Sequence, residues 1–212
     1  GCAFIEVNSK GQNRIIVSAG TNRMYTEEYI KNVLEKAEAG DFVLLQNEIN
    51  MVGEIIRLSH EKGCRVVFNA SPIPGKPEEL PLELVDIFMV NELEAAALAG
   101  TSTEGDFRDI LKALQKKYPK AAIVMTLGKE GVFYGYKEEF YSHPIFKVNA
   151  VDTTAAGDTF CGYFLAALCA EKSVETALRE ASAASAMAVS AKGAAPSIPV
   201  HSAVEEWLCG RS

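Results

Sequence analysis

Apolar residues occur in two different patterns along this chain, and segments with one pattern alternate with segments with the other. Short apolar runs bounded by polar or turn residues predict buried strands, at residues 41–46, 64–70, 83–91 and 121–128. Segments with apolar side chains three and four residues apart predict helices, at residues 26–40, 50–63, 92–100, 106–119, 159–171, 174–193 and 201–210. Strands that alternate with helices indicate an α/β protein with a mostly parallel sheet that helices cover on both faces.

Two further segments predict antiparallel pairs. Residues 2–20, CAFIEVNSKGQNRIIVSAG, contain two short strands around the polar turn NSKGQ, which is typical of a β-hairpin. The runs GVFYGY (131–136) and EEFYSHPIFKV (138–148) predict an antiparallel edge of the sheet. The proline-rich stretch SPIPGKPEELP at residues 71–81 is interpreted as a loop between elements, and no internal repeat or linker divides the chain.

Composition narrows the class of protein. The chain has 212 residues, a net charge of −7 and an isoelectric point near 5.1. This acidity argues against a nucleic-acid-binding surface, although a local pocket can still bind an anionic small molecule. The five cysteines lack CxxC or Cys/His spacing, which predicts buried, reduced thiols. No signal peptide or membrane-spanning run is found, so we expect a cytoplasmic protein.

The stretch VDTTAAGDTF at residues 151–160 carries the strongest chemical signal. Asp158 follows Gly157 at the expected start of a helix, where unpaired N–H groups and the helix dipole favour anions. The small residues Ala155 and Ala156 leave room for an oxyanion beside those amides. An ionised Asp158 could then take a proton from an alcohol that attacks phosphorus. The other interpretation is an N-cap aspartate in front of an alanine-rich packing helix.

Two other strand ends add polar groups. TLGKEG (Thr126 to Gly131) follows an apolar strand with two glycines, so it could lie along a nucleotide or could be a plain β-turn. Asn91 and Glu94 in VNELEAAAL lie one helical turn apart, where both side chains could reach a hydrated magnesium ion. The same spacing also fits a capping box, with Asn91 as N-cap and Glu94 three residues later.

The segment SAKGAAPSIPV at residues 190–200 follows a helix of very small residues. Small residues, a turn glycine and two prolines fit close backbone packing, and they equally fit carbonyl groups arranged around a cation. The spacing does not decide between these two interpretations.

Taken in order, these motifs resemble one family. VDTTAAGDTF followed by AVSAKGAAPSIP, with VNELEAAALAG and VMTLGKEGVFY upstream, is similar to the ribokinase-like (PfkB) carbohydrate kinases over the whole chain. The resemblance implies a three-layer ribokinase-like fold. It also implies transfer of the γ-phosphoryl group of ATP to the primary hydroxyl of D-ribose, or of a similar sugar, with Mg²⁺ accompanying ATP and K⁺ as a monovalent activator.

The resemblance also assigns roles to residues. Asp158 matches the catalytic base, and Ala155, Ala156 and Gly157 match its anion hole. Asn91 and Glu94 match the motif that organises magnesium and the phosphates, and Glu48 matches a contact to a sugar hydroxyl. The nucleotide contacts matched are Thr126, Leu127, Gly128, Lys129, Glu130, Gly131 and Ser182. The potassium site matched consists of Asp152, Thr154, Ala188, Ala191, Gly193 and Ser197.

The chain also departs from the family pattern. Family members begin with a sheet strand, a sugar-binding segment and a Gly-Gly motif that this sequence lacks, so we expect the N-terminal part to be absent. Residues 1–22 are then interpreted as half of the β lid that covers the sugar and often dimerises, and residues 23–212 as the α/β nucleotide-binding core. We expect little sugar kinase activity from this chain alone.

Two other functions stay open, and a third is excluded. A kinase for fructose, a nucleoside or deoxyribose differs mainly in a sugar pocket that the sequence hardly contains. A catalytically silent remnant acting as an interaction module has no distinguishing sequence feature. An NAD-dependent Rossmann enzyme is excluded because no GxGxxG follows the first strand of an α/β unit.

Overall fold

The computed structural model describes residues 1–7 and 13–211, and the chain divides into two compact units, Gly1–Phe88 and Met89–Ser212. The turn expected at residues 8–12 lies outside the described residues. The expected division between residues 22 and 23 stays a prediction. The fold class is confirmed: strands and helices alternate, and six strands form one mostly parallel sheet in the order β3-β4-β5-β6-β7-β8.

Unit 1 begins with the expected hairpin. Strands β1 (Cys2–Val7) and β2 (Asn13–Ser18) pair antiparallel, with Phe4 opposite Ile16 and Ala3 opposite Val17. A 3-10 turn at Gly20–Arg23 follows. Because opposite residues in such a pair point to the same face, Phe4 and Ile16 share one face and Val17 belongs to the other.

The rest of unit 1 is a small α/β layer around a parallel strand pair. Its elements are α1 (Glu27–Leu34), β3 (Phe42–Gln46), α2 (Val52–Glu61), β4 (Arg65–Asn69) and two 3-10 turns at Pro77–Glu79 and Leu82–Leu84. β4 is buried along Val66, Val67 and Phe68, whereas Leu44 on β3 is 44% exposed. β3 is therefore an end strand with an uncovered apolar side chain.

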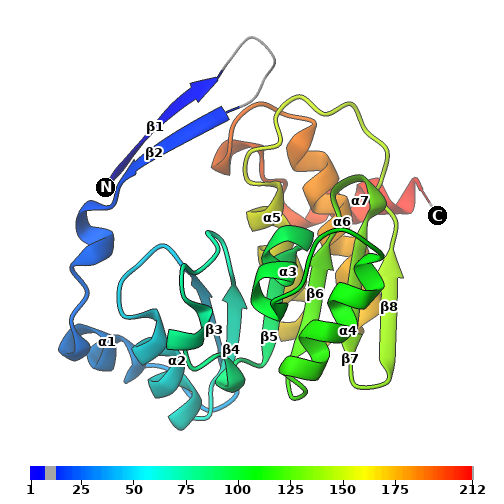
Figure 1. Cartoon of the computed structure of the whole chain (residues 1–212). Helices are drawn as coiled ribbons and strands as arrows, with labels where there is room; N and C mark the ends of the chain where they lie inside the picture. The colour runs from blue at the N-terminus through cyan, green and yellow to red at the C-terminus, as the bar shows by residue number, and fades with distance from the viewer. Residues whose placement is uncertain (8–12, 212) are drawn as a thin grey trace. The chain divides into compact units, whose positions relative to one another are not determined.

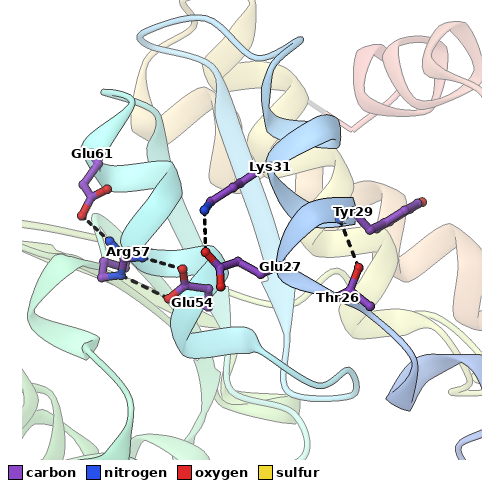
Figure 2. Close-up of polar contacts among 7 residues, drawn as sticks. All are labelled: Thr26, Glu27, Tyr29, Lys31, Glu54, Arg57 and Glu61. Atoms are coloured by element: carbon purple, nitrogen blue, oxygen red, sulfur yellow. Dashed lines mark hydrogen bonds and ion pairs between the residues drawn. The ribbon is translucent and has the colours of Figure 1, made fainter.

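Polar contacts lie on the outer surfaces of the two helices of unit 1 (Figure 2). The Thr26 hydroxyl accepts a hydrogen bond from the Tyr29 amide and so caps α1, as the sequence predicts. On α2, the Arg57 guanidinium bonds to Glu54 and Glu61, one turn away on either side. Exposed pairs of this kind contribute little to stability, so the buried apolar faces of the helices hold them in place.

The first helix ends earlier than the sequence predicts. α1 stops at Leu34 instead of Gly40, and residues 35–41 form turns in which the Ala37 amide donates to the Leu34 carbonyl. The Asp41 carboxylate accepts from the Glu38 amide and fixes the end of this turn. The spacing of apolar residues does not reveal such a side-chain contact, so the sequence pattern could not predict this turn.

Unit 2 places helices on both faces of its strands. Its elements are β5 (Ile87–Asn91, where the two units meet in the sequence), α3 (Glu92–Ala99), α4 (Phe107–Lys117), β6 (Ala122–Thr126), β7 (Val132–Tyr136), β8 (Glu139–His143), α5 (Ala156–Cys169), α6 (Val174–Val189) and α7 (His201–Cys209). Figure 1 shows α3 and α4 on one face of β6 and β7 and α6 on the other. β6-β7-β8 is the expected antiparallel edge.

The core of unit 2 is built from small residues where helices meet and large ones where helices meet strands. α6 buries Ala177, Ala181, Ala184 and Ala188 completely, which lets α5 approach it closely, while Phe164 of α5 is fully buried. None of the five cysteines, which all lie in the described part of the chain, forms a disulfide, and only Cys64 and Cys161 are buried. The expectation of buried thiols is therefore wrong for the other three, because they lie at chain or helix ends.

Candidate active site

The first turn of α5 presents backbone amides that no side chain caps. The N-cap, Ala155, has left-handed backbone angles (φ 59°, ψ 13°) and offers no side-chain acceptor, whereas Thr26, Asn91, Asp106 and Ser173 cap other helices with their side chains. Left-handed geometry is rare for alanine, and next to a helix start it turns successive N–H groups toward one point. The geometry suits an oxyanion.

Asp158 is the third residue of α5 and is exposed to solvent. The interpretation of Asp158 as an N-cap is wrong, because that position belongs to Ala155. Asp158 instead lines one end of a cavity of about 460 Å³ along α5. Figure 1 shows the N-terminus of α5 at the end of unit 2 where β5 and β6 finish, which is where α/β sheets bind ligands.

Asp152 joins the segment before α5 to the segment after α6. One carboxylate oxygen accepts from the Thr154 amide (3.0 Å) and the other from the Gly193 amide (3.0 Å). The amides of Val151 and Asp152 also donate to the Val189 carbonyl. These bonds bring Asp152, Thr154 and Gly193 together, three of the six residues expected at a potassium site.

The hydrogen bonds to Asp152 lower its pKa. The Thr154 hydroxyl has the largest effect, followed by the Thr154 and Gly193 amides, and together they bring the pKa from 3.8 to about 2. Because the folded-state pKa lies below the ordinary one, the stabilisation is complete above pH 3.8 and is lost as the pH falls toward 2.

We therefore expect the Asp152 carboxyl to remain largely ionised at about pH 3, where an ordinary aspartate is mostly protonated. Carboxyl-carbon NMR titration of the folded chain measures this directly. Thr154→Ala should raise the midpoint toward 3.8, whereas Thr153→Ala, at the neighbouring exposed position, should leave it unchanged. An Asp152 midpoint near 3.8 in the unsubstituted chain would contradict the assigned contacts.

The other predicted potassium-site residues lie in the last turn of α6 and in the segment after it. Ala188 is buried in that last turn, and its carbonyl accepts from the Ala191 amide. Ser197 is 9% exposed, and its hydroxyl donates to the Ala194 carbonyl at 2.7 Å. A carboxylate and clustered carbonyl groups are the oxygen donors that a hard cation requires, so the donor set fits a monovalent cation.

Asn91 and Glu94 form a complete capping box at the start of α3. The Asn91 side chain accepts from the Glu94 amide, and the Glu94 carboxylate accepts from the Asn91 amide, each at 2.9 Å. Glu94 is only 7% exposed. The capping interpretation is confirmed, and it does not conflict with a role toward a metal, because a carboxylate has a second oxygen.

Asn91→Ala should separate the structural role from the functional one. Removing the cap acceptor is expected to lower the free energy of unfolding by about 0.5–2 kcal/mol, measured by urea denaturation. Asn91→Asp keeps an acceptor and should preserve stability. If Asn91 also serves the phosphates, Asn91→Asp will weaken ATP binding in calorimetry because of the added negative charge. Unchanged ATP affinity in Asn91→Asp would show that Asn91 acts only as a helix cap.

The predicted nucleotide loop connects β6 to β7. Residues Gly128–Glu130 form a 3-10 turn, closed by the Leu127 amide donating to the Gly131 carbonyl at 2.8 Å. Gly131 has φ 98°, and a Cβ there would lie 2.2 Å from the His143 carbonyl oxygen, so only glycine fits. Gly128, Lys129 and Glu130 are exposed. The turn interpretation therefore holds and leaves these groups accessible.

Two further residues were predicted to belong to the site, Ser182 and Glu48. Ser182 is half-buried in the middle of α6. Glu48 is exposed in the turn after β3, at the carboxyl end of that strand, and belongs to unit 1. Both positions stay predictions.

One positioning contact was not anticipated from the sequence. The Ser185 hydroxyl of α6 donates to the Ala156 carbonyl at 3.0 Å and so ties α6 to the first turn of α5. This alanine-rich helix contains two serines, Ser182 and Ser185, and nothing in the sequence favours Ser185 over Ser182.

Comparisons with known proteins show which family the chain resembles over most of its length. The family model described as "pfkB family carbohydrate kinase" matches residues 1–201. A ribokinase from Haemophilus influenzae is 36% identical over 212 residues, covering 98% of this chain and 69% of the relative. The crystal structure of ribokinase from Thermotoga maritima has a TM-score of 0.84 and 36% identity, with coverages of 98% and 69%. Ribokinase from Arabidopsis thaliana, solved with ribose and ATP, has a TM-score of 0.81 and 31% identity, with coverages of 97% and 68%.

A search of the helices for membrane-spanning candidates gave a negative result. Within residues 1–7 and 13–211, none combines the length and apolar character that a bilayer crossing requires.

Proposed function

The chain belongs to the pfkB family of carbohydrate kinases, and from this membership we propose that it transfers the γ-phosphoryl group of ATP to the primary hydroxyl of D-ribose. The product would be ribose 5-phosphate. The single observation that carries the proposal is the pairing of Asp158 with the uncapped amides that follow left-handed Ala155. A carboxylate and an oxyanion cradle on one helix turn supply the base and the charge stabilisation that this transfer needs.

Asp158 would act as the general base. Its exposed carboxylate would accept the proton of the sugar hydroxyl as the hydroxyl oxygen bonds to phosphorus and the bond from phosphorus to the β-phosphate oxygen of ATP breaks. The amides of the first turn of α5 would hold the oxygens of the transferred group. The Ser185 contact and the Asp152 contacts keep that turn in place before substrate binds.

The nucleotide and metal roles rest on the family match and on donor chemistry. Residues Thr126 to Gly131 would border the nucleotide with their exposed turn, and Ser182 would border the adenine. Asn91 and Glu94 would hold the Mg²⁺ that accompanies ATP, which compensates charge on the phosphates when bound. The segment around Asp152 and Gly193 would hold K⁺, a nearby positive charge that favours anion binding at the cradle.

The β1–β2 hairpin would be the sugar lid and a dimer surface, with Glu48 contacting a sugar hydroxyl. Both faces of the hairpin are apolar and exposed: Phe4 is 63%, Ile16 52% and Val17 67% exposed. A two-stranded sheet gains stability when it covers such faces, one against ligand and one against a partner copy. Analytical ultracentrifugation should show a dimer that Val17→Lys dissociates; a monomer at all concentrations would remove the dimer proposal.

The reaction is tested by incubating the chain with ATP and, separately, ribose, deoxyribose, fructose or a nucleoside, at high protein concentration because we expect little activity from this chain alone. Formation of ADP should exceed the sugar-free background most with ribose, and ³¹P NMR should show phosphate on the C5 oxygen. Such an enzyme would work where ATP is made and used, in the cytoplasm. Nucleotide binding without transfer to any sugar would instead favour a silent interaction module.

A further inference from the structure

A side chain of α6 reaches the main chain of α5 at its first turn. Ser185 is half-buried in α6, and its hydroxyl donates to the Ala156 carbonyl at 3.0 Å. Ala181 and Ala188, four residues before and three residues after Ser185, lie on the same side of α6 and are fully buried. Because these neighbours are small, α6 can approach α5 closely enough for a short serine side chain to contact its backbone.

This contact bears on the orientation of one backbone amide. The Ala156 carbonyl and the Gly157 N–H belong to the same planar, trans peptide unit and point in opposite directions. A hydrogen bond that holds the carbonyl therefore also sets the direction of the N–H. The carbonyl oxygen has two lone pairs, so it can accept from the Ser185 hydroxyl and from the helical amide four residues later. Gly157 is exposed, so its N–H is accessible to a ligand.

The start of α5 needs such support because its backbone is strained. Ala155 has left-handed angles (φ 59°), which are unfavourable for a residue with a Cβ and persist only where the surrounding structure enforces them. α6 contacts the chain on both sides of Ala155. The Val189 carbonyl accepts from the Asp152 amide at 3.2 Å, and Ser185 donates to the Ala156 carbonyl.

We propose that Ser185 is a positioning residue for phosphoryl transfer, whose hydroxyl holds the Ala156–Gly157 peptide plane so that the Gly157 N–H points at the transferred group. The inference rests on the proposed function, in which the first-turn amides of α5 hold the oxygens of that group. Hydrogen bonds weaken steeply as the donor turns away from its acceptor. A donor that is fixed beforehand needs no reorganisation when charge develops on those oxygens.

Ser185→Ala should lower kcat about tenfold, which is less than the loss typical when an oxyanion donor is removed outright. The affinity for ATP should be unchanged, because the oriented donor serves the transferred group and not the bound nucleotide. Ser185→Cys fills the same space with a side chain that is only a weak donor. It should show the same loss as Ser185→Ala, which separates the hydrogen bond from packing.

Tyr163→Phe is the matched control for Ser185→Ala. The Tyr163 hydroxyl also ties α5 to another segment through a backbone carbonyl, that of Pro199, at 2.7 Å. The amide in that peptide plane belongs to Val200, which lies outside the first turn of α5. Each variant loses one bond of the same kind, so the two melting temperatures should fall by similar amounts. Tyr163→Phe should nevertheless keep kcat within about twofold.

Two measurements test the inference without turnover. In the free chain, backbone ¹⁵N relaxation should give the Gly157 amide an order parameter near about 0.85, typical of a rigid backbone, which falls toward about 0.6 in Ser185→Ala and stays high in Tyr163→Phe. Aluminium fluoride with ADP mimics the group in transfer. The gain in ADP affinity on adding aluminium fluoride and ribose should shrink about tenfold in Ser185→Ala and stay unchanged in Tyr163→Phe.

The outcomes separate this inference from the proposed function. An unchanged Gly157 order parameter in Ser185→Ala would overturn the inference, because the hydroxyl would then not hold the peptide plane. An undiminished fluoroaluminate gain in Ser185→Ala, or an equal loss of that gain in Tyr163→Phe, would overturn it as well. If the unsubstituted chain shows no gain at all, the proposed function fails, and the order parameters still decide whether Ser185 orients the Gly157 amide.

Discussion

Asp158→Asn is expected to lower kcat for ribose phosphorylation by about 10²–10⁴-fold, the range that general-base catalysis contributes. The amide keeps the size and polarity of the carboxylate but cannot accept the proton of the sugar hydroxyl. Affinity for ATP, measured by calorimetry, should change little, because the first-turn amides of α5 and the turn at Gly128–Glu130 are untouched. The loss should therefore appear in kcat rather than in nucleotide binding.

Glu175→Gln is the matched control for Asp158→Asn. Glu175 is also an exposed acid in the first turn of a helix, but α6 is capped by the Ser173 side chain. Its replacement should leave kcat within about twofold, because surface substitutions away from special features have small effects. An Asp158→Asn rate close to that of the unsubstituted chain would remove Asp158 from the chemistry.

Gly157→Val is expected to abolish stabilisation of the transferred phosphoryl group without damaging the fold. A Cβ at Gly157 meets no described atom within 4 Å, and valine has a better helix propensity than glycine, so thermal stability should be maintained. The new side chain, however, stands beside the amides that would hold the oxyanion. Losing one such donor typically costs about 10²–10³-fold in kcat.

Binding of ADP with aluminium fluoride gives a readout of Gly157→Val that does not need turnover. ADP affinity should be unchanged, while the gain in affinity from adding fluoroaluminate and ribose should disappear. Gly210→Val, at the exposed end of α7 where a Cβ also has room, is the control and should retain that gain. If Gly157→Val keeps the gain, the amides of α5 do not hold the transferred group.

The spacing of apolar residues was sufficient to predict the alternation of strands and helices. Each element buries one face in the core, and this burial determines which positions are apolar. It placed β3, β4, β6 and β7 within a few residues. It misplaced the end of α1, because residues 35–41 form turns that include the bond from the Glu38 amide to the Asp41 carboxylate. The left-handed backbone of the N-cap residue Ala155 could not be predicted either, because alanine rarely adopts this conformation.

The site prediction rests on the order of the motifs, because each single spacing allows two interpretations. Asn91 and Glu94 fit a capping box and a metal motif equally well in the sequence, and the structure contains the capping box. The contact between Asp152 and Gly193 joins residues 41 positions apart, so only the packing of α5 against α6 brings them together. The Thr159 hydroxyl is buried with no hydrogen-bond partner in residues 1–7 and 13–211, and this depends on its neighbours in space, which the sequence alone does not give.

A crystal structure of the chain with ADP, aluminium fluoride, Mg²⁺ and ribose would test the central claim most directly. We predict that the fluoroaluminate lies against the amides of Gly157 and Asp158 in the first turn of α5, with the primary hydroxyl of ribose within hydrogen-bond distance of the Asp158 carboxylate. A fluoroaluminate bound at another helix start, or a ribose hydroxyl held by a different base, would contradict the account.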